Sequence, residues 1–395
     1  MEYAQIEKIF NEIFTENELF DIRHEIHMHP EIGGEEFHTD DVICENLEKW
    51  GIPYERGVAD TGVVAKLSGK YPGKTIAIRA DIDALPITEE TDFPYKSVIP
   101  GRMHACGHDI HTTVLLGLAK FLKHLDGNYA GNFTLIFQPA EESFGGADRM
   151  IKAGVLENPH VDHVIGLHCG TGNALGHVGI RYGAMYAGSD AMAVKIIGKS
   201  AHAAYPAGGL DPIVMAGQMV SAVQSVVSRN ISPQNSAVVT FGTIHGGTVQ
   251  NQIPDEVELK GTIRTLDPET REFAIKRVEQ VCRGVVEGMG GKLEFTRIPS
   301  YPPLVNDDAI VDVVREVLTD ALGEERVHLE KQSAMGCEDF AYFAAQRPSA
   351  YWHLGCRPET GEVFGGHNCR FNPDERGIDY GVKLQAAIAL RLAGN

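Results

Sequence analysis

The sequence predicts an α/β protein in which a mostly parallel sheet, covered by helices on both faces, carries a smaller inserted domain. Strands that are apolar throughout alternate with helical segments in the first half of the chain, a pattern typical of a parallel sheet buried on both sides. From about residue 187 to residue 298 the order becomes strand, helix, strand, strand, helix, strand, which is the ferredoxin-like βαββαβ motif. A chain of 395 residues is also long for a single core. We therefore predict one domain from residues 1–186 and 299–395 and a second from residues 187–298.

The first part of the main domain is predicted to alternate helices and strands. Residues 4–29 are expected to form one helix, since apolar residues recur on one stripe before Pro30. A second helix is expected near residues 40–50, a third over residues 109–125, and a short one after about residue 146. The expected strands are short apolar runs at residues 62–67, 75–79, 132–138 and 161–167.

Two aspartate–proline pairs mark the helices of the inserted domain. Asp211-Pro212 and Asp267-Pro268 each place a capping carboxylate before a proline that fits the first helical position. These helices are expected to end near residues 228 and 287. Strands are expected at residues 191–198, 236–244, 256–264 and 292–297. The main domain then resumes with a helix, a strand and a closing helix, at residues 308–322, 351–354 and 376–392.

Charge and cysteine usage limit the partners of the protein. Lys+Arg 35 against Asp+Glu 54 gives a formal net charge of −19, which repels phosphate backbones and anionic membrane surfaces. We therefore expect neither nucleic acid nor a membrane as a partner. The first residues lack a basic stretch followed by an apolar core, so a cytoplasmic location is expected. Seven scattered cysteines without a Cys-x-x-Cys pair are not typical of a disulfide framework, and we expect reduced thiols.

The strongest local signal leads into the helix predicted over residues 109–125. A thiolate and a neutral imidazole two residues apart, Cys106 and His108, suit a borderline-soft divalent metal, zinc above all. A free buried cysteine among surface histidines is the alternative for this stretch alone, because Cys-x-His is a short pattern. The remaining ligands must therefore come from elsewhere in the chain. The full stretch is Met103-His104-Ala105-Cys106-Gly107-His108-Asp109-Ile110-His111.

Further ligand-type residues follow predicted strands or lie in a late loop. Glu141 and Glu142 follow one apolar strand, His168 follows another, and His367 lies in a glycine-rich loop before the closing helix. The carboxyl ends of strands are the usual place for site residues in an α/β sheet. These side chains are therefore expected to converge.

Five ligands, one of them shared, would serve two metals, since one catalytic zinc takes three protein ligands plus water. We assign Cys106 to both ions, because a thiolate has the charge and lone pairs to span two cations. His108 and His168 complete one ion, and Glu142 and His367 complete the other.

Two pairs of carboxylates need separate roles. Adjacent carboxylates at a strand end point in different directions, so with Glu142 as ligand, Glu141 can act as general base. The metal lowers the pKa of its water to about 7, and Glu141 then passes the proton to the leaving amine.

Asp81 and Asp83 follow the strand at 75–79, and we expect one of them to orient a metal-bound histidine. Capping of a turn is the alternative, and we count Asp83 with the catalytic residues.

Histidines at the end of the first predicted helix also raise the question of metal binding. His24 and His27 share a helical face, whereas His29 lies next to Pro30, which stops the helix. We expect packing or hydrogen-bonding roles for all three.

Seven stretches match a known pattern in order along nearly the whole chain. They are Arg79-Ala80-Asp81-Ile82-Asp83-Ala84-Leu85-Pro86, Met103 to His111, Gln138-Pro139-Ala140-Glu141-Glu142, Leu167-His168, Gly198-Lys199-Ser200-Ala201-His202, Gly261-Thr262-Ile263-Arg264 and Glu338-Asp339-Phe340. Together they closely resemble the aminoacylase/carboxypeptidase-type dinuclear metal amidohydrolases. That family includes hippurate hydrolases, N-acyl-amino-acid deacylases and the plant auxin-conjugate hydrolases.

The resemblance implies hydrolysis of N-acyl amino acids at two divalent ions, Zn, Mn, Co or Ni, with the five ligands and the general base already chosen. It also implies that the inserted domain is a lid that mediates formation of a homodimer or higher oligomer. The lid histidine matching His202 is expected to reach the site of the partner subunit and stabilise the tetrahedral oxyanion. The residues matching Asn251 and Arg264 are expected to hold the substrate carboxylate.

Two other functions are open on the sequence. A dipeptidase or carboxypeptidase at the same centre would need room or a countercharge for a free amino group, whereas a deacylase needs an apolar acyl pocket. A metal-storage or binding module would be indicated by loss of Glu141 or of a ligand, and none is lost. Cys169, Cys337 and Cys369 depart from the usual family pattern and bear on the substrate pocket.

Overall fold

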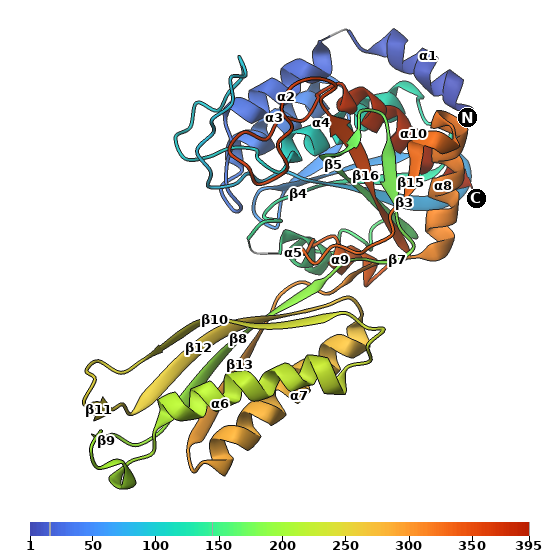
Figure 1. The fold of residues 1–395 in the computed structure, drawn as a ribbon. Helices are drawn as coiled ribbons and strands as arrows, with labels where there is room; N and C mark the ends of the chain where they lie inside the picture. Colours follow the sequence, from blue (N-terminus) through green and yellow to red (C-terminus); the bar gives the residue numbers. More distant parts are fainter. Residues whose placement is uncertain (16, 144, 395) are drawn as a thin grey trace. The chain divides into compact units, whose positions relative to one another are not determined.

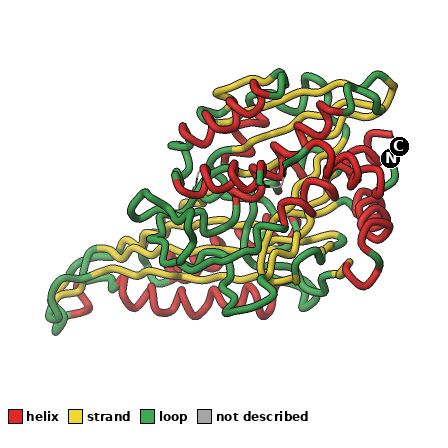
Figure 2. The backbone as a smooth tube through the Cα atoms, turned by 90° about the horizontal axis from the view of Figure 1, so that it is seen from above, coloured by secondary structure: helices red, strands yellow, loops and turns green. Residues whose placement is uncertain are grey.

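The chain folds into two compact units in a computed structural model that describes residues 1–15, 17–143 and 145–394 (Figure 1). Unit 1 consists of Met1–Gly183, Asn306–Lys331 and Tyr342–Asn395, and unit 2 of Ala184–Val305 and Gln332–Ala341. Figure 2 shows the helices and strands along the backbone and the loops that connect them. Among the described residues, no helix combines the length and the apolar character that crossing a bilayer requires.

The central sheet of unit 1 is mostly parallel, as predicted. Strands β4, β3, β5 and β16 are parallel neighbours, whereas β1–β2, β2–β4 and β16–β6 pair in antiparallel fashion. β6 and β15 are again parallel. In spatial order the eight strands are β1 (Tyr54–Val58), β2 (Gly62–Ser68), β4 (Ala130–Gln138), β3 (Tyr71–Asp81), β5 (His163–Ala174), β16 (Ser349–Arg357), β6 (Val178–Ile180) and β15 (Val327–Leu329).

Both faces of this sheet are buried, which explains its uniformly apolar strands. In β4, Phe133, Leu135 and Phe137 belong to the large apolar cluster of unit 1, whereas Ile136 is fully buried on the opposite face. Figure 1 shows helices on both sides of the sheet, with α4 and α10 on one side and α5 on the other. The helices of unit 1 are α1 (Tyr3–Ile13), α2 (Glu18–Met28), α3 (Phe37–Lys49), α4 (His108–His124), α5 (Gly146–Lys152), α8 (Asp308–Leu322) and α10 (Gly377–Gly394), with a 3-10 turn at Glu324–Arg326.

Two sequence predictions in unit 1 are wrong. The single helix predicted over residues 4–29 is two helices, α1 and α2, because Phe14 is extended (φ −105°, ψ 136°) and the poor helix formers Thr15 and Asn17 follow it. His168 is predicted to follow a strand, whereas in the structure it lies inside β5. The strand continues because β16 supplies main-chain partners beyond Gly170 as far as Ala174, and this pairing outweighs the low strand propensity of its glycines.

Unit 2 contains a four-stranded antiparallel sheet with two helices on one face (Figure 1). Asp211 accepts hydrogen bonds from the main-chain N–H groups of Ile213 and Val214, and Asp267 accepts one from Thr270, so both predicted caps form. A π-helical turn, Val226–Asn230, extends the first helix. In chain order the elements are β8 (Gly188–Ile197), α6 (Pro212–Ser225), β10 (Ala237–Gly246), β12 (Glu256–Thr265), α7 (Pro268–Gly288) and β13 (Lys292–Pro299), and the sheet order is β10-β12-β8-β13.

Short elements complete the fold. The pair β9 (Ala201–His202) and β11 (Gln252–Ile253) lies at one end of unit 2 (Figure 1). A second two-stranded sheet joins β7 (Gly183–Tyr186) to β14 (Leu304–Asn306), a 3-10 turn covers Pro206–Gly208, and α9 is one turn at Ala341–Ala344.

Candidate metal centre

Strand register in unit 1 brings the predicted site residues to one edge of the sheet. β3 and β4 are parallel with Asp81 opposite Gln138, so the turn carrying Glu141 and Glu142 begins where β3 ends. β5 is parallel to β3 with Arg79 opposite Gly166, which puts His168 at the level of Asp81. The convergence therefore follows from the parallel sheet.

Cys106 is common to two groups of potential ligands. The ligand-type atoms of Cys106, His108 and His168 lie within 4.8 Å of one another, and so do those of Cys106, Glu142 and His367. Cys106 Sγ is 3.3 Å from His168 Nε2, and His367 Nε2 is 3.1 Å from Glu142 Oε1. The structure thus brings all five predicted ligands together in the two predicted trios.

Hydrogen bonds to one nitrogen of His108 and one of His168 leave the other nitrogen of each ring available. Asp83 Oδ1 lies 3.1 Å from His108 Nδ1, and His108 Nε2 is buried without a hydrogen-bond partner. His168 Nδ1 donates to the main-chain oxygen of Cys169 at 2.6 Å, which leaves Nε2 directed at Cys106. Asp83 Oδ2 also accepts from the N–H of Glu142 at 3.0 Å. Asp83 therefore touches one potential ligand from each trio.

The protonation chemistry of the cluster fits divalent cations. Burial raises the pKa of the Cys106 thiol to about 12, so a nearby cation is needed to stabilise the thiolate at neutral pH. The hydrogen bond that the His367 ring donates to Glu142 raises the pKa of His367, and a cation would replace the proton held between them. The cluster offers thiolate, imidazole and carboxylate donors, and the buried Nε2 of His108 has no hydrogen-bond partner. This donor set matches that of a dinuclear zinc-type site.

Unusual backbone conformations surround the cluster. Gly107, between Cys106 and His108, has φ +93°, and a Cβ there would lie 2.3 Å from Cys169 Sγ. Ala140, directly before Glu141, has φ +57°, and His367 itself has φ +62°. Left-handed conformations are uncommon in residues other than glycine and gather at functional sites, where the surrounding structure holds them.

Glu141 is buried, with 6% of its surface exposed, whereas Glu142 is half-buried. The two side chains therefore have different environments, as their predicted roles require. The main-chain N–H of Ala140 donates to Glu36 Oε1 at 2.8 Å, which anchors the turn that carries both carboxylates.

His111 and Asp81 form a supporting pair that sequence reasoning did not assign. His111 Nδ1 donates to Asp81 Oδ1 at 2.5 Å, and His111 Nε2 accepts from the N–H of Cys169 at 2.8 Å. Burial alone would raise the pKa of Asp81, but Arg79 and the neighbouring histidines hold it well below its usual range. The sequence signal that could have indicated this role is the position of His111 in the same motif as Cys106.

A buried ionic network lies at the start of α4. Arg23 Nε donates to Asp109 Oδ2 at 2.9 Å, and His27 Nδ1 lies 2.9 Å from the same oxygen. Arg23 Nη1 donates to Glu375 at 2.9 Å, and His24 Nε2 lies 2.7 Å from that carboxylate. The hydrogen-bonding roles predicted for His24 and His27 are confirmed, and the network fixes the helix that begins with His108.

The predicted lid residues of unit 2 do not all meet within one chain. Pairing of β9 with β11 sets His202 opposite Gln252, and the N–H of Ala203 donates to Asn251 at 3.0 Å, so His202 and Asn251 are neighbours. Arg264 lies near the far end of β12, eight residues beyond Glu256, a distance on the order of 25 Å along a strand. Arg264 and Asn251 of one chain therefore cannot hold the same small substrate.

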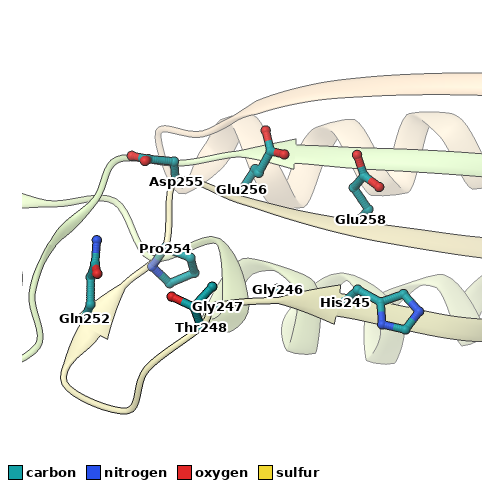
Figure 3. Close-up of a pocket in the computed structure, with 9 residues that line it drawn as sticks. All are labelled: His245, Gly246, Gly247, Thr248, Gln252, Pro254, Asp255, Glu256 and Glu258. Atoms are coloured by element: carbon teal, nitrogen blue, oxygen red, sulfur yellow. The ribbon is translucent and has the colours of Figure 1, made fainter.

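A groove of about 520 Å³ also lies in unit 2, between the end of β10 and the start of β12 (Figure 3). Its lining includes Asp255, Glu256 and Glu258. Lys195 Nζ lies 2.7 Å from Glu256 and 3.5 Å from Glu258, so one ammonium group offsets part of the charge of these two carboxylates. We assign this groove no catalytic role.

Known proteins resemble the chain over nearly its whole length. The pattern of peptidase family M20/M25/M40 matches residues 77–391. N-acetyl-L-cysteine deacetylase of Bacillus subtilis (strain 168) is 40% identical over 364 residues, which cover 92% of this chain and 85% of that protein. IAA-amino acid hydrolase ILR1-like 4 of Arabidopsis thaliana is 39% identical over 397 residues, covering 98% and 89%. Thermostable carboxypeptidase 1 of Saccharolobus solfataricus is 36% identical over 394 residues, covering 98% and 99%.

Solved structures show the same fold. A protein of methicillin-resistant Staphylococcus aureus superposes with a TM-score of 0.93 at 34% identity, covering 99% of both chains. A protein of Bacillus subtilis, described as a dinuclear metal-binding peptidase of family M20, has a TM-score of 0.83 at 32% identity and covers 97% of this chain and 98% of its own.

Proposed function

The chain belongs to peptidase family M20/M25/M40 and is a metal-dependent amidohydrolase, and we propose that it hydrolyses N-acyl amino acids to a carboxylic acid and a free amino acid. The observation that carries the proposal is the pair of ligand trios that share Cys106. Relatives named N-acetyl-L-cysteine deacetylase and IAA-amino acid hydrolase support this substrate class.

We assign two divalent ions to the trios. His108 and His168 would hold one ion, Glu142 and His367 would hold the other, and Cys106 would contribute its thiolate to both. When bound, such ions supply a Lewis acid for the amide carbonyl and a water of lowered pKa. Zinc suits the donor set best, and manganese, cobalt and nickel are the other candidates.

Glu141 is the general base in this proposal. Its carboxylate takes a proton from the attacking water and returns it to the nitrogen of the leaving amino acid, so that the carboxylate is regenerated in each cycle. The buried position of Glu141 supports the role, because a dry environment strengthens its interaction with that proton. Asp83 acts through His108 and Glu142, whose positions it holds.

His202 is the proposed oxyanion donor, acting from the partner subunit. The N–H of Ala204 donates to His202 Nδ1 at 3.1 Å, so the neutral ring carries its proton on Nε2, which is free to donate. Arg264 lies near the end of β12, whereas Asn251 lies before the start of that strand, and this separation supports a site built from two chains, with Arg264 of one chain and Asn251 of the other on the substrate carboxylate.

A lid-mediated homodimer or higher oligomer is consistent with the surface of unit 2. Strand β10 is an edge of its sheet and exposes Val238 and Ile244, while α6 exposes Ile213 and Val214. An edge strand with exposed apolar side chains is suited to pairing with a second copy. We also propose a cytoplasmic location, since the seven cysteines are free thiols.

A dipeptidase or carboxypeptidase activity is the second candidate, because one relative is named a carboxypeptidase. One experiment separates the two functions: initial rates on N-acetyl, N-benzoyl and indole-acetyl amino acids beside simple dipeptides, with metal content measured on the same sample. Faster turnover of the acyl amino acids supports the proposal, and preferential cleavage of dipeptides replaces it with the peptidase function.

A further inference from the structure

A group of ligand-type side chains that shares no residue with the candidate centre lies where α2 ends and α3 begins. It consists of Glu25, His29 and His38, whose ligand-type atoms all lie within 4.8 Å of one another. We propose that these three residues bind an additional divalent cation, zinc(II) or another ion that accepts imidazole and carboxylate donors.

The spacing of the three side chains matches that of ligands around one ion. Glu25 Oε1 lies 3.2 Å from His29 Nδ1 and 3.0 Å from His38 Nε2, and the two rings have their centroids 4.6 Å apart. Ligand atoms about 2.0–2.1 Å from a tetrahedral zinc are roughly 3.3 Å from one another. The cluster therefore needs only small side-chain movements to surround a cation.

The protons in the cluster can be exchanged for a metal. His29 Nδ1 also lies 3.0 Å from the main-chain oxygen of Glu25. His38 Nε2 hydrogen-bonds to the same Glu25 carboxylate that His29 contacts. A neutral imidazole has one protonated nitrogen, and metal binding releases the proton of any nitrogen that becomes a ligand. Two imidazoles and one carboxylate form the donor set of zinc sites that leave a position open for water.

The backbone holds the three ligands in place before any ion binds. Glu25 lies in the last turns of α2 and His29 is the C-cap residue four positions later, so the two side chains are about one turn apart. Glu31 holds the main chain of His38 at the start of α3. Its carboxylate accepts hydrogen bonds from the main-chain N–H groups of His38 and Thr39, both at 3.0 Å. Glu31 is thereby occupied as a helix cap, and little conformational freedom is lost when the site closes around a cation.

Electrostatics and access favour a cation at this position. The side chains of His29, His38 and Glu25 are 34%, 38% and 44% exposed, so an ion can enter and keep some of its water. His29 is the C-cap of α2, where the helix dipole attracts positive charge. A groove that includes Glu25 is further lined by Glu18, Asp21, Glu45 and Lys49, and negative charge remains in excess even though Lys120 pairs with Glu18 at 2.6 Å.

The proposal is tested by counting bound zinc in the full chain. Equilibrium dialysis at micromolar free zinc, followed by elemental analysis, should give about one ion per chain fewer for His38→Asn and for Glu25→Gln than for the parent protein. The matched control is His160→Asn, since His160 lies beside a single carboxylate, Glu157, at 3.7 Å. This control should bind as much zinc as the parent.

Further measurements on the same proteins make the result decisive. Circular dichroism and thermal unfolding establish that each variant is folded, and anomalous scattering from zinc-soaked crystals should show a peak between Glu25, His29 and His38. Zinc should also raise the unfolding temperature of the parent protein by more than it raises that of the two cluster variants. Equal zinc content in the parent and both folded variants, or no anomalous peak at the cluster, would overturn the proposal.

Discussion

The main-chain N–H of Cys169 donates to His111 Nε2 at 2.8 Å, which links the strand carrying His168 to the first turns of α4. Since Nε2 accepts, His111 carries its proton on Nδ1 and donates it to Asp81 at 2.5 Å. On the other side of the same residue, the carbonyl of Cys169 accepts from His168 Nδ1. The peptide groups on either side of Cys169 are thus held by two histidines, one of which is a proposed metal ligand.

This arrangement predicts a specific defect in His111→Ala. Removing the imidazole leaves the buried N–H of Cys169 unpaired, which should cost about 1–3 kcal/mol of unfolding free energy. Metal affinity should fall by about 10–100-fold, as is typical when a partner that orients a ligand is lost. Chelator competition measures the affinity, and His124→Ala, at the exposed end of α4, is the control. Unchanged metal affinity would assign His111 a purely structural role.

Substitution of Cys106 tests whether its sulfur serves both ions. The parent protein should approach about two divalent ions per chain after saturation. Cys106→Ser should weaken both ions, because the thiolate common to the two trios is gone. Elemental analysis after dialysis measures the loss, and Cys337→Ser, in unit 2, serves as the control. Full occupancy and activity in Cys106→Ser would remove Cys106 from the bridge.

The two adjacent glutamates should respond differently to the same substitution. Glu141→Gln keeps the size of the side chain but removes the base, so turnover should fall by roughly 10²–10⁴-fold with metal content unchanged. Glu142→Gln should instead release metal, because its carboxylate lies in the ligand trio. Kinetics and metal analysis on the same samples measure both effects. Metal loss in Glu141→Gln would show that the two roles are exchanged.

Local patterns were sufficient for much of the fold. The helix predicted over residues 308–322 is α8, Asp308–Leu322, because its apolar stripe and the Asp307 cap are both local signals. The mostly parallel sheet was also predictable, since β4 is apolar on both faces. The break between α1 and α2 was missed because the apolar stripe continues across it through Phe14, whose ring packs on Phe10 at 4.7 Å.

The parts of the site that depend on contacts between residues far apart in the sequence could not be predicted. Asp81 and Asp83 are two residues apart at the end of one strand. The packing of α4 against that strand decides that Asp81 hydrogen-bonds with His111 and Asp83 with His108. The ion pair between Arg23 and Asp109 spans 86 positions, and no local pattern indicates such a partner. The same holds for His38 and Glu25, which are brought together by the contact between two helices.

The Arg23–Asp109 pair predicts a large effect on stability. Both side chains are buried, with 0% and 1% exposure, so Arg23→Met leaves the Asp109 carboxylate in a dry environment with His27 beside it but without its arginine partner. Breaking a buried pair from one side typically costs about 3–5 kcal/mol of unfolding free energy. Chemical denaturation at saturating metal measures the change. Lys8→Met, which removes an exposed pair with Glu12, should change stability by less than about 1 kcal/mol.

Mixed dimers test whether His202 acts across the subunit interface. His202→Ala should lower turnover by about 10²–10³-fold with metals still bound, which is the usual cost of losing one oxyanion donor. In a dimer of one His202→Ala and one Glu141→Gln chain, one site would combine an intact Glu141 with the intact His202 of the other chain. Random exchange should therefore restore up to about a quarter of parent activity, since half of the dimers are mixed and each has one complete site. No recovery despite subunit exchange, verified by native mass spectrometry, would place His202 in its own chain's site. Parent-level turnover in His202→Ala alone would remove His202 from catalysis.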